Sequence, residues 1–144
     1  MAKFKFKFDS VNKVKQNLEK KVKRELAIVN MEINNISLEI EQLYKEKEKV
    51  RQGAFNNSRI RANELQAQLN YENFVDELIK SKKEKKAEKE IEKGKIIEEL
   101  AMKKKEVKIF DSLKDKHYQN YLVEENKAEL SLLDDIASKR LTKA

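Results

Sequence analysis

The sequence has no cysteine, no proline and no tryptophan, and it has only two glycines in 144 residues. The lack of cysteine excludes a disulfide framework and a thiolate for zinc binding or catalysis, so we expect a reducing, cytoplasmic setting. Proline and glycine are the residues that punctuate strands and tight turns, and here only Gly53 and Gly94 are present. The sequence therefore predicts long helices with few interruptions.

Long hydrophobic runs are absent as well. The longest, Leu26 to Val29, has four residues, whereas a membrane span needs roughly 20. The first residues alternate lysine and phenylalanine, unlike a secretory signal peptide, so we expect no export by that route. Hydrophobic residues make up 39% of the chain and charged residues 41%. This balance disfavours a round core but suits a pair of helices, which needs only a narrow apolar seam.

The formal net charge of +7 raises the possibility of a nucleic-acid partner. However, 28 of the 33 basic residues are lysine, and the guanidinium groups that read phosphates and base edges are few. The most basic stretch, Lys80 to Lys108, intersperses 12 lysines with seven glutamates. That pattern is typical of a solvated helix face, so we predict no nucleic-acid partner.

The spacing of apolar residues predicts an all-α fold. From Leu26 to Val50 they follow alternating steps of three and four, with Lys47 as the one polar member. Upstream, the spacing predicts a stutter that locally unwinds the supercoil. The residues placed in this upstream seam are Val11, Val14, Leu18 and Val22. A second apolar face follows from Ile96 and includes Leu100, Val107, Phe110, Leu113, His117, Tyr121, Ala128, Leu132 and Ile136.

We therefore expect a single domain, 1–144, that forms a long antiparallel two-helix coiled-coil hairpin with a shorter helical connector. The expected elements are helix one at about 9–52, a connector helix at about 59–80 and a C-terminal helix at about 81–142. Gly53 and the polar Asn56, Asn57 and Ser58 should end helix one. Segment 81–95 is charged almost throughout, and we expect it to be an exposed helix with little to pack against. A parallel homodimer is the competing arrangement.

No catalytic constellation is found in the sequence. The glycines are isolated, so a phosphate-cradling loop is missing. His117 lacks the glutamate three residues before it that helical metal sites use, and we interpret it as a seam residue. Asp134 and Asp135 point about 100° apart on a helix and would not converge on one atom. We predict no enzyme activity, no cofactor, no metal and no small-molecule substrate.

The alternation of Phe4, Phe6 and Phe8 has three interpretations. It could form a short strand, act as a hydrophobic staple for helix one, or provide an apolar tip that enters a pocket of a partner.

Several segments resemble the family of the flagellar export protein FliJ. They are the opening MAKFKFKF, the segment NYENFVDEL at 70–78, and the stretch from Lys108 to Leu141. The last of these carries Glu125, Asn126 and Glu129, followed by Asp134, Asp135, Ile136 and Ala137. The resemblance implies a non-enzymatic antiparallel hairpin, similar to the central stalk of rotary ATP synthases, that inserts into the hexameric export ATPase and promotes its activity. It also implies contact with the cytoplasmic domain of the membrane export gate, escort of export chaperones, a role in motility, and a peripheral location at the inner face of the cell membrane.

The family's functional residues map onto two surfaces. The resemblance places the export-gate contact at Phe74 and Leu78. It places the ATPase-ring contact at a tip where the two ends of the hairpin meet, comprising Phe4, Phe6, Phe8, Asp134, Asp135, Ile136 and Arg140. A general coiled-coil scaffold and the stalk protein of an injectisome are the alternative functions.

Overall fold

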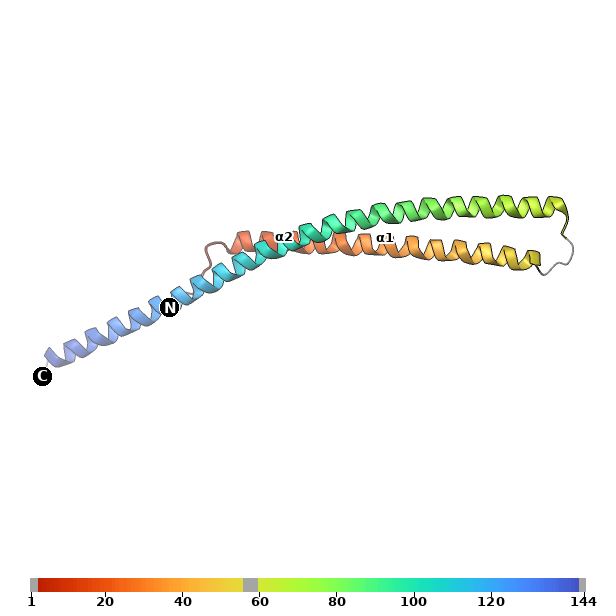
Figure 1. Cartoon of the computed structure of the whole chain (residues 1–144). Coiled ribbons are helices and arrows are strands. Elements are labelled where there is room, and N and C mark those ends of the chain that lie inside the picture. Colours follow the sequence, from red (N-terminus) through yellow and green to blue (C-terminus); the bar gives the residue numbers. More distant parts are fainter. Residues whose placement is uncertain (1–2, 56–59, 143–144) are drawn as a thin grey trace. The chain divides into compact units, whose positions relative to one another are not determined.

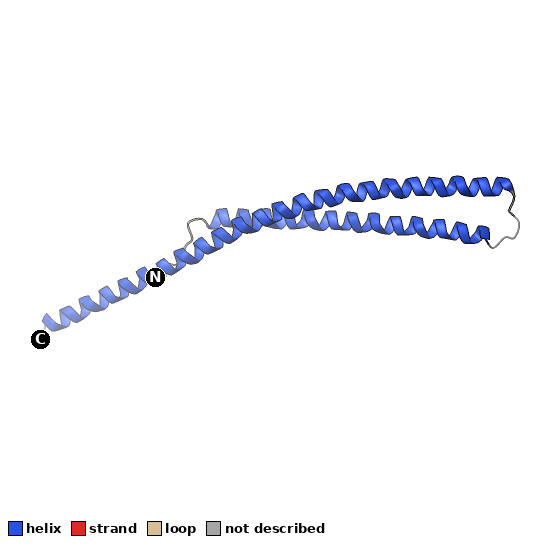
Figure 2. Cartoon of the chain, in the orientation of Figure 1, coloured by secondary structure: helices blue, strands red, loops and turns tan. Residues whose placement is uncertain are grey.

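The computed structural model describes residues 3–55 and 60–142, which form two α-helices. Helix α1 runs from Asp9–Phe55 and helix α2 from Ala62–Thr142 (Figure 1). The described residues contain no strand (Figure 2). The predicted all-α class, with two helices packed together, is confirmed. Over the described ranges, neither helix has a stretch apolar enough and long enough to cross a membrane.

Both helices begin with an acidic residue in the first turn, and α2 also ends with basic residues. Asp9 lies in the first turn of α1, where a carboxylate is favourable, and its side chain pairs with Lys13 one turn later at 3.5 Å. Glu64 lies in the first turn of α2, while Lys139 and Arg140 lie in its last turn. These placements follow the usual preference for acids at the start and bases at the end of a helix.

The chain divides into two compact units, and each is described separately. Unit 2 is Val22–Glu99 and contains a stretch of each helix. Ion pairs between described residues join these stretches: Glu32–Lys89 at 2.8 Å, Glu39–Lys82 at 2.7 Å, Lys47–Asp76 at 2.6 Å and Arg51–Glu72 at 2.9 Å. As the α1 partners advance along the chain, the α2 partners step back. The two stretches in this unit therefore run in opposite directions.

The core of unit 2 is a small apolar cluster. Ile40 of α1 packs with Val75 and Ile79 of α2, and Val75 has only 1% of its surface exposed. Ile36 and Leu43 pack against this cluster from α1. The α1 members follow the predicted heptad spacing, so the seam predicted from Leu26 onward is confirmed here.

The remainder of the unit 2 seam is asymmetric. At its heptad positions α2 carries four half-buried lysines, while α1 continues its apolar stripe with the buried Val29 and Ile33. The four are Lys82, Lys86, Lys89 and Lys93. Lysine can lay its aliphatic stem along apolar surface while its ammonium group stays in water or reaches a carboxylate. The expectation that 81–95 has little to pack against is thus wrong, because the lysine stems and the Glu32 and Glu39 pairs join it to α1.

Unit 1 is Met1–Lys21 together with Leu100–Ala144. Asn12 is almost fully buried, and its Nδ2 donates a hydrogen bond to Oδ1 of Asp111 at 3.3 Å. One turn later, Lys15 pairs with Glu106 at 3.1 Å. The first turns of α1 therefore face α2 with polar residues.

This polar contact corrects the predicted upstream seam. Val11 and Val14 were placed in the seam, but both are exposed. Asn12 and Lys15, the residues directly after them, take the facing positions, where the amide nitrogen of Asn12 and the ammonium group of Lys15 find partners on α2. Val22 is buried as expected, although it belongs to unit 2.

Helix boundaries also differ from those expected. We expected a connector helix to end at residue 80, but α2 continues from Ala62 through that position to Thr142. The sequence that follows, 80–90, is mostly lysine and glutamate and has no proline or glycine, so nothing ends the helix. Helix α1 continues past Gly53 to Phe55. Asn56, Asn57 and Ser58, expected to break the chain, lie outside the described residues.

Candidate functional site

The phenylalanines before α1 form an aromatic cluster with α2, all within unit 1. Phe4 packs against Tyr118 and Tyr121, with ring centroids 5.2 and 5.4 Å away. Phe6 lies edge-on to His117 at 5.5 Å. Phe8 contacts His117 at 6.3 Å and Phe110 at 6.5 Å. Such edge-to-face pairs stabilise beyond the area that they bury.

This cluster decides between the interpretations of the phenylalanine alternation. Residues 3–6 are not a strand, and residues 7 and 8 form a turn into α1. Phe6 is buried, while Phe4 and Phe8 are half-buried. The three rings therefore fasten the start of the chain onto α2, rather than standing out as an apolar tip. His117 lies in this contact as a half-buried seam residue, as its spacing predicts.

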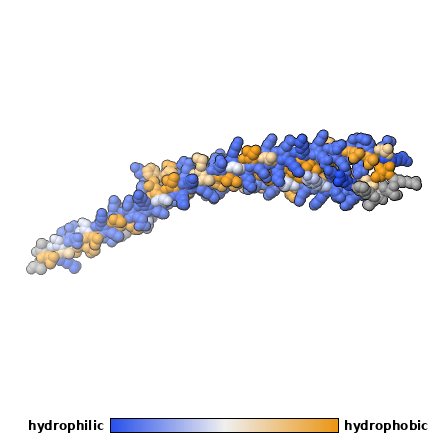
Figure 3. Space-filling model, viewed as in Figure 1, coloured by the Kyte–Doolittle hydropathy of each residue, from blue (hydrophilic) through white to orange (hydrophobic). Residues whose placement is uncertain are grey.

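Beyond this cluster α2 continues for about six turns as a segment that we call the overhang, residues 122–142. Every side chain from Asn126 to Leu141 is exposed. Among them are five large apolar residues: Leu130, Leu132, Leu133, Ile136 and Leu141. Apolar surface is visible along the C-terminal part of α2 in Figure 3. Several large apolar side chains exposed along one helix are a candidate binding surface.

A shallow apolar hollow on the overhang shows which kind of partner would fit. It has a volume of about 370 Å³ and is lined by Glu125, Ala128, Glu129, Leu132 and Leu133. The first four are spaced as i, i+3, i+4 and i+7, which is the set of residues that forms a hole for a side chain from a facing helix. The hollow thus has the residue spacing that accepts a side chain from a facing helix.

The residues expected at the ATPase-ring tip are not all brought together. Phe4, Phe6 and Phe8 contact α2 between Phe110 and Tyr121. Asp134 follows Tyr121 by 13 residues, which is about 20 Å along the helix. The phenylalanines and Asp134 thus do not meet at one tip, because α2 continues well past the residues that the phenylalanines contact.

The C-terminal members of the expected tip also lie on different sides of the overhang. Ile136 and Arg140 are four residues apart and share a face. Asp134 projects about 160° from Ile136, on the polar side of the helix with Ser131. Asp135 lies between, about 100° from both. The acidic pair and the apolar face would therefore contact different parts of a partner.

The expected export-gate residues lie on α2 in unit 2, directly beside the core. Phe74 is 58% exposed, whereas its neighbour Val75 is buried. Leu78 is half-buried and lies one turn after Phe74 on the same side of the helix. An exposed phenylalanine ring with a leucine beside it can anchor a partner side chain.

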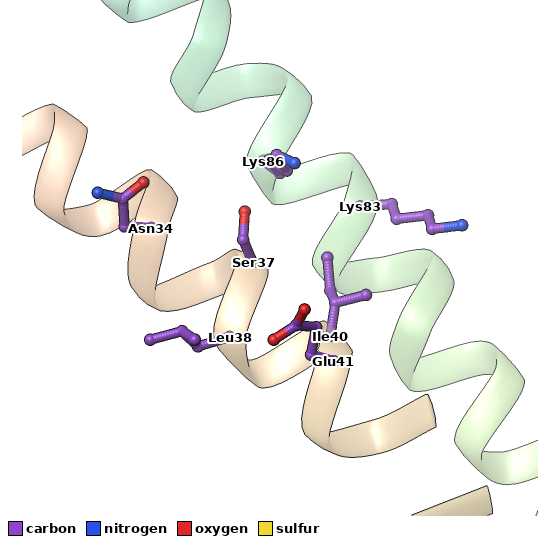
Figure 4. Close-up of a pocket in the computed structure, with 7 residues that line it drawn as sticks. All are labelled: Asn34, Ser37, Leu38, Ile40, Glu41, Lys83 and Lys86. Carbon is purple, nitrogen blue, oxygen red and sulfur yellow. The ribbon is translucent and has the colours of Figure 1, made fainter. Parts of the chain in front are cut away.

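Unit 2 also has an open groove between its two helix stretches, shown in Figure 4. Its volume is about 620 Å³, and Ile40 points into the space between the helices. Lys83 and Lys86 contribute positive charge from α2, and Glu41 contributes negative charge from α1. The full lining is Asn34, Ser37, Leu38, Ile40, Glu41, Lys83 and Lys86. This mixed, open lining suits a side chain of a protein partner better than a small substrate, which prefers an enclosed pocket.

Charged groups in both units act in ion pairs between helices. The hydrogen bond from Lys15 lowers the pKa of Glu106, and the hydrogen bond to Glu32 raises the pKa of Lys89. Both shifts favour the charged forms that hold α1 to α2. Among the described residues, no three histidine, cysteine, aspartate or glutamate side chains are grouped so that they could hold a metal ion.

Sequence reasoning missed two features of these surfaces. One is the buried Asn12, because the apolar spacing assigned its neighbours Val11 and Val14 to the seam instead. The other is the lysine stripe on α2, although its spacing of four, three and four continues from Ile79 through Lys82 to Lys93. That spacing was the available signal.

The chain was compared with known proteins in three ways. No curated protein and no solved structure gives a significant match. A family model described as the flagellar FliJ protein matches residues 4–144, which is essentially the whole chain. The match includes the aromatic cluster, both helices and the overhang. The chain therefore belongs to the flagellar FliJ protein family and is a component of the flagellar export apparatus.

Proposed function

We propose that this chain is the non-enzymatic stalk of the export apparatus and that its overhang enters the central pore of the hexameric export ATPase. The observation that carries this proposal is the length of α2, which leaves every side chain from Asn126 to Leu141 exposed. A single helix is narrow enough for a ring pore, and its exposed apolar side chains would pack against the inner surface of the ring.

In this proposal the whole chain is an antiparallel hairpin. The opposite directions of the two stretches within unit 2 support it, as do the Asn12–Asp111 and Lys15–Glu106 contacts within unit 1. Ile136 and Arg140 contact the ring on one side of the overhang, and Asp134 and Asp135 contact basic groups on another. The ring contact depends indirectly on the three phenylalanines Phe4, Phe6 and Phe8. They hold the start of α1 against α2, next to the point where the overhang begins.

We further propose that Phe74 and Leu78 bind the cytoplasmic domain of the export gate. The exposure of Phe74 beside a buried core supports an anchoring role, since a rigid helix presents the ring without loss of backbone freedom. The remaining exposed helix faces would receive export chaperones. The protein would then be cytoplasmic and would act at the inner face of the cell membrane.

The ring proposal is tested by ATPase assays with the cognate export ATPase. The intact chain should raise ATP hydrolysis without hydrolysing ATP itself. A chain truncated after Glu125 should keep the same helical fraction per residue by circular dichroism but lose the stimulation. Phe74→Ala serves as the matched control, because it lies in unit 2 and should stimulate like the intact chain. Full stimulation by the truncated chain would refute the proposal.

The gate proposal needs a separate binding measurement. Phe74→Ala should weaken binding to the isolated cytoplasmic domain of the gate by roughly tenfold or more, because a central aromatic anchor is commonly worth about 2 kcal/mol. Phe110→Ala is a control from the aromatic cluster of unit 1 and should leave this binding unchanged. Equal loss in both variants would argue against a specific contact at Phe74.

A further inference from the structure

One face of the overhang carries a self-complementary pattern. Glu129, Leu133, Ile136 and Arg140 are spaced by four, three and four residues, so they follow one another along the same side of α2. Leu133 and Ile136 are 60% and 44% exposed. The face therefore has an apolar centre, with an acid at one end and a base at the other.

The spacing reads the same in both directions. If a second copy of this helix lies antiparallel, with the two-fold axis midway between Leu133 and Ile136, then Leu133 of each copy faces Ile136 of the other. Glu129 of each copy then faces Arg140 of the other, which places two ion pairs of opposite charge at the two ends of the apolar centre. Such a contact is isologous, meaning that the same patch serves both partners and the assembly closes as a dimer.

A parallel arrangement in register lacks this complementarity. It would place Glu129 opposite Glu129 and Arg140 opposite Arg140, and like charges that face each other are destabilising. The neighbouring exposed residues extend the apolar surface on either side of the central face, since Leu130, Leu132 and Ala137 flank it. The polar side of the helix, with Ser131 and Asp134, would stay in water.

We propose that the overhang pairs with the overhang of a second copy of this chain, as an antiparallel homodimer centred between Leu133 and Ile136. The charge order along the face and its symmetric spacing favour a second copy over an unrelated helix. The interface is short, so the dimer is weak and forms only at raised protein concentration. This inference does not rest on the proposed function, although a dimer would cover the surface that the ATPase is proposed to bind.

A charge-exchange experiment tests this pairing with the full chain and no ATPase. Sedimentation equilibrium over a wide range of protein concentrations should show a monomer–dimer equilibrium for the natural sequence. Glu129→Arg and Arg140→Glu each turn two attractive pairs into repulsive ones, so each should weaken dimerisation on the order of tenfold. The double variant restores opposite charges and should dimerise nearly as well as the natural sequence.

The control is Ser131→Arg, which adds a charge on the polar side of the same segment and should leave the equilibrium unchanged. Circular dichroism of each variant checks that the helix content is kept. A natural chain that stays monomeric throughout would overturn the proposal. So would single variants that dimerise like the natural chain, a double variant that does not regain dimerisation, or a Ser131→Arg chain that loses it.

Discussion

The seam of unit 2 makes a quantitative prediction that one pair of substitutions can test. Ile40 and Ile28 are the same residue on the same helix in the same unit, but Ile40 is 9% exposed and packs on Val75, whereas Ile28 is 56% exposed. Ile40→Ala removes three carbon groups from a buried site. At about 0.8 kcal/mol for each buried group, the loss is about 2–3 kcal/mol. The cavity term stays small, because the space opens to solvent.

Ile28→Ala should change stability by less than about 0.5 kcal/mol, since the exposed side chain contributes little packing and alanine has the better helix propensity. Urea denaturation followed by circular dichroism gives both values. With an m-value of about 2 kcal/mol per molar urea, Ile40→Ala should lower the midpoint by roughly 1 M and Ile28→Ala hardly at all. Equal shifts for the two variants would refute the assignment of the buried stripe.

Three further predictions concern unit 1. A double-mutant cycle with Asn12→Ala and Asp111→Ala should give a coupling energy of about 1 kcal/mol in urea denaturation, because the two side chains share a hydrogen bond to a charged group. A coupling energy of zero would show that Asn12 does not set the register of the two helices. Phe6→Ala should speed proteolytic cleavage near the start of the chain, since the buried ring fastens this segment to α2. An unchanged cleavage rate would mean that Phe6 does not hold the segment on α2. Because the pKa of Glu106 is lowered by its hydrogen bond with Lys15, the stabilisation by this pair is present above the ordinary pKa of glutamate and is lost as pH falls through the lowered value. Lys15→Gln should therefore raise the pKa of Glu106 in an NMR titration, and no change would mean that the pair is not formed in solution.

The sequence predicted the helices and the apolar side of the seam, because the spacing of three and four is a local property of each helix. Val29, Ile33 and Ile40 are buried where that spacing places them. The spacing did not predict the positions where a polar residue faces the other helix, because the partner that makes its burial favourable lies far away in the chain. Asn12 is buried because Asp111 meets it 99 residues later, and Val14 is exposed as a result of that register.

The same limit applies to the candidate surfaces. The residues of the overhang could be identified from the sequence, but not how far α2 extends past the segment that faces it. That length depends on where the aromatic cluster fixes the start of α1, through contacts such as Phe4 with Tyr121. The expectation of a tip where both ends meet assumed helices of matching length. The structure separates the phenylalanines from Asp134 and Ile136, and it leaves the latter two on an exposed helix.

Hydrogen exchange with and without the cognate export ATPase tests the central claim most directly, at a protein concentration low enough to keep the chain monomeric. Alone, the amides of 126–141 should exchange far faster than those around Ile40 and Val75, because a helix with exposed side chains on every face opens readily. With the ATPase, protection should rise in 126–141. Protection of this segment in the isolated monomer, or no gain when the ATPase is bound, would contradict the account.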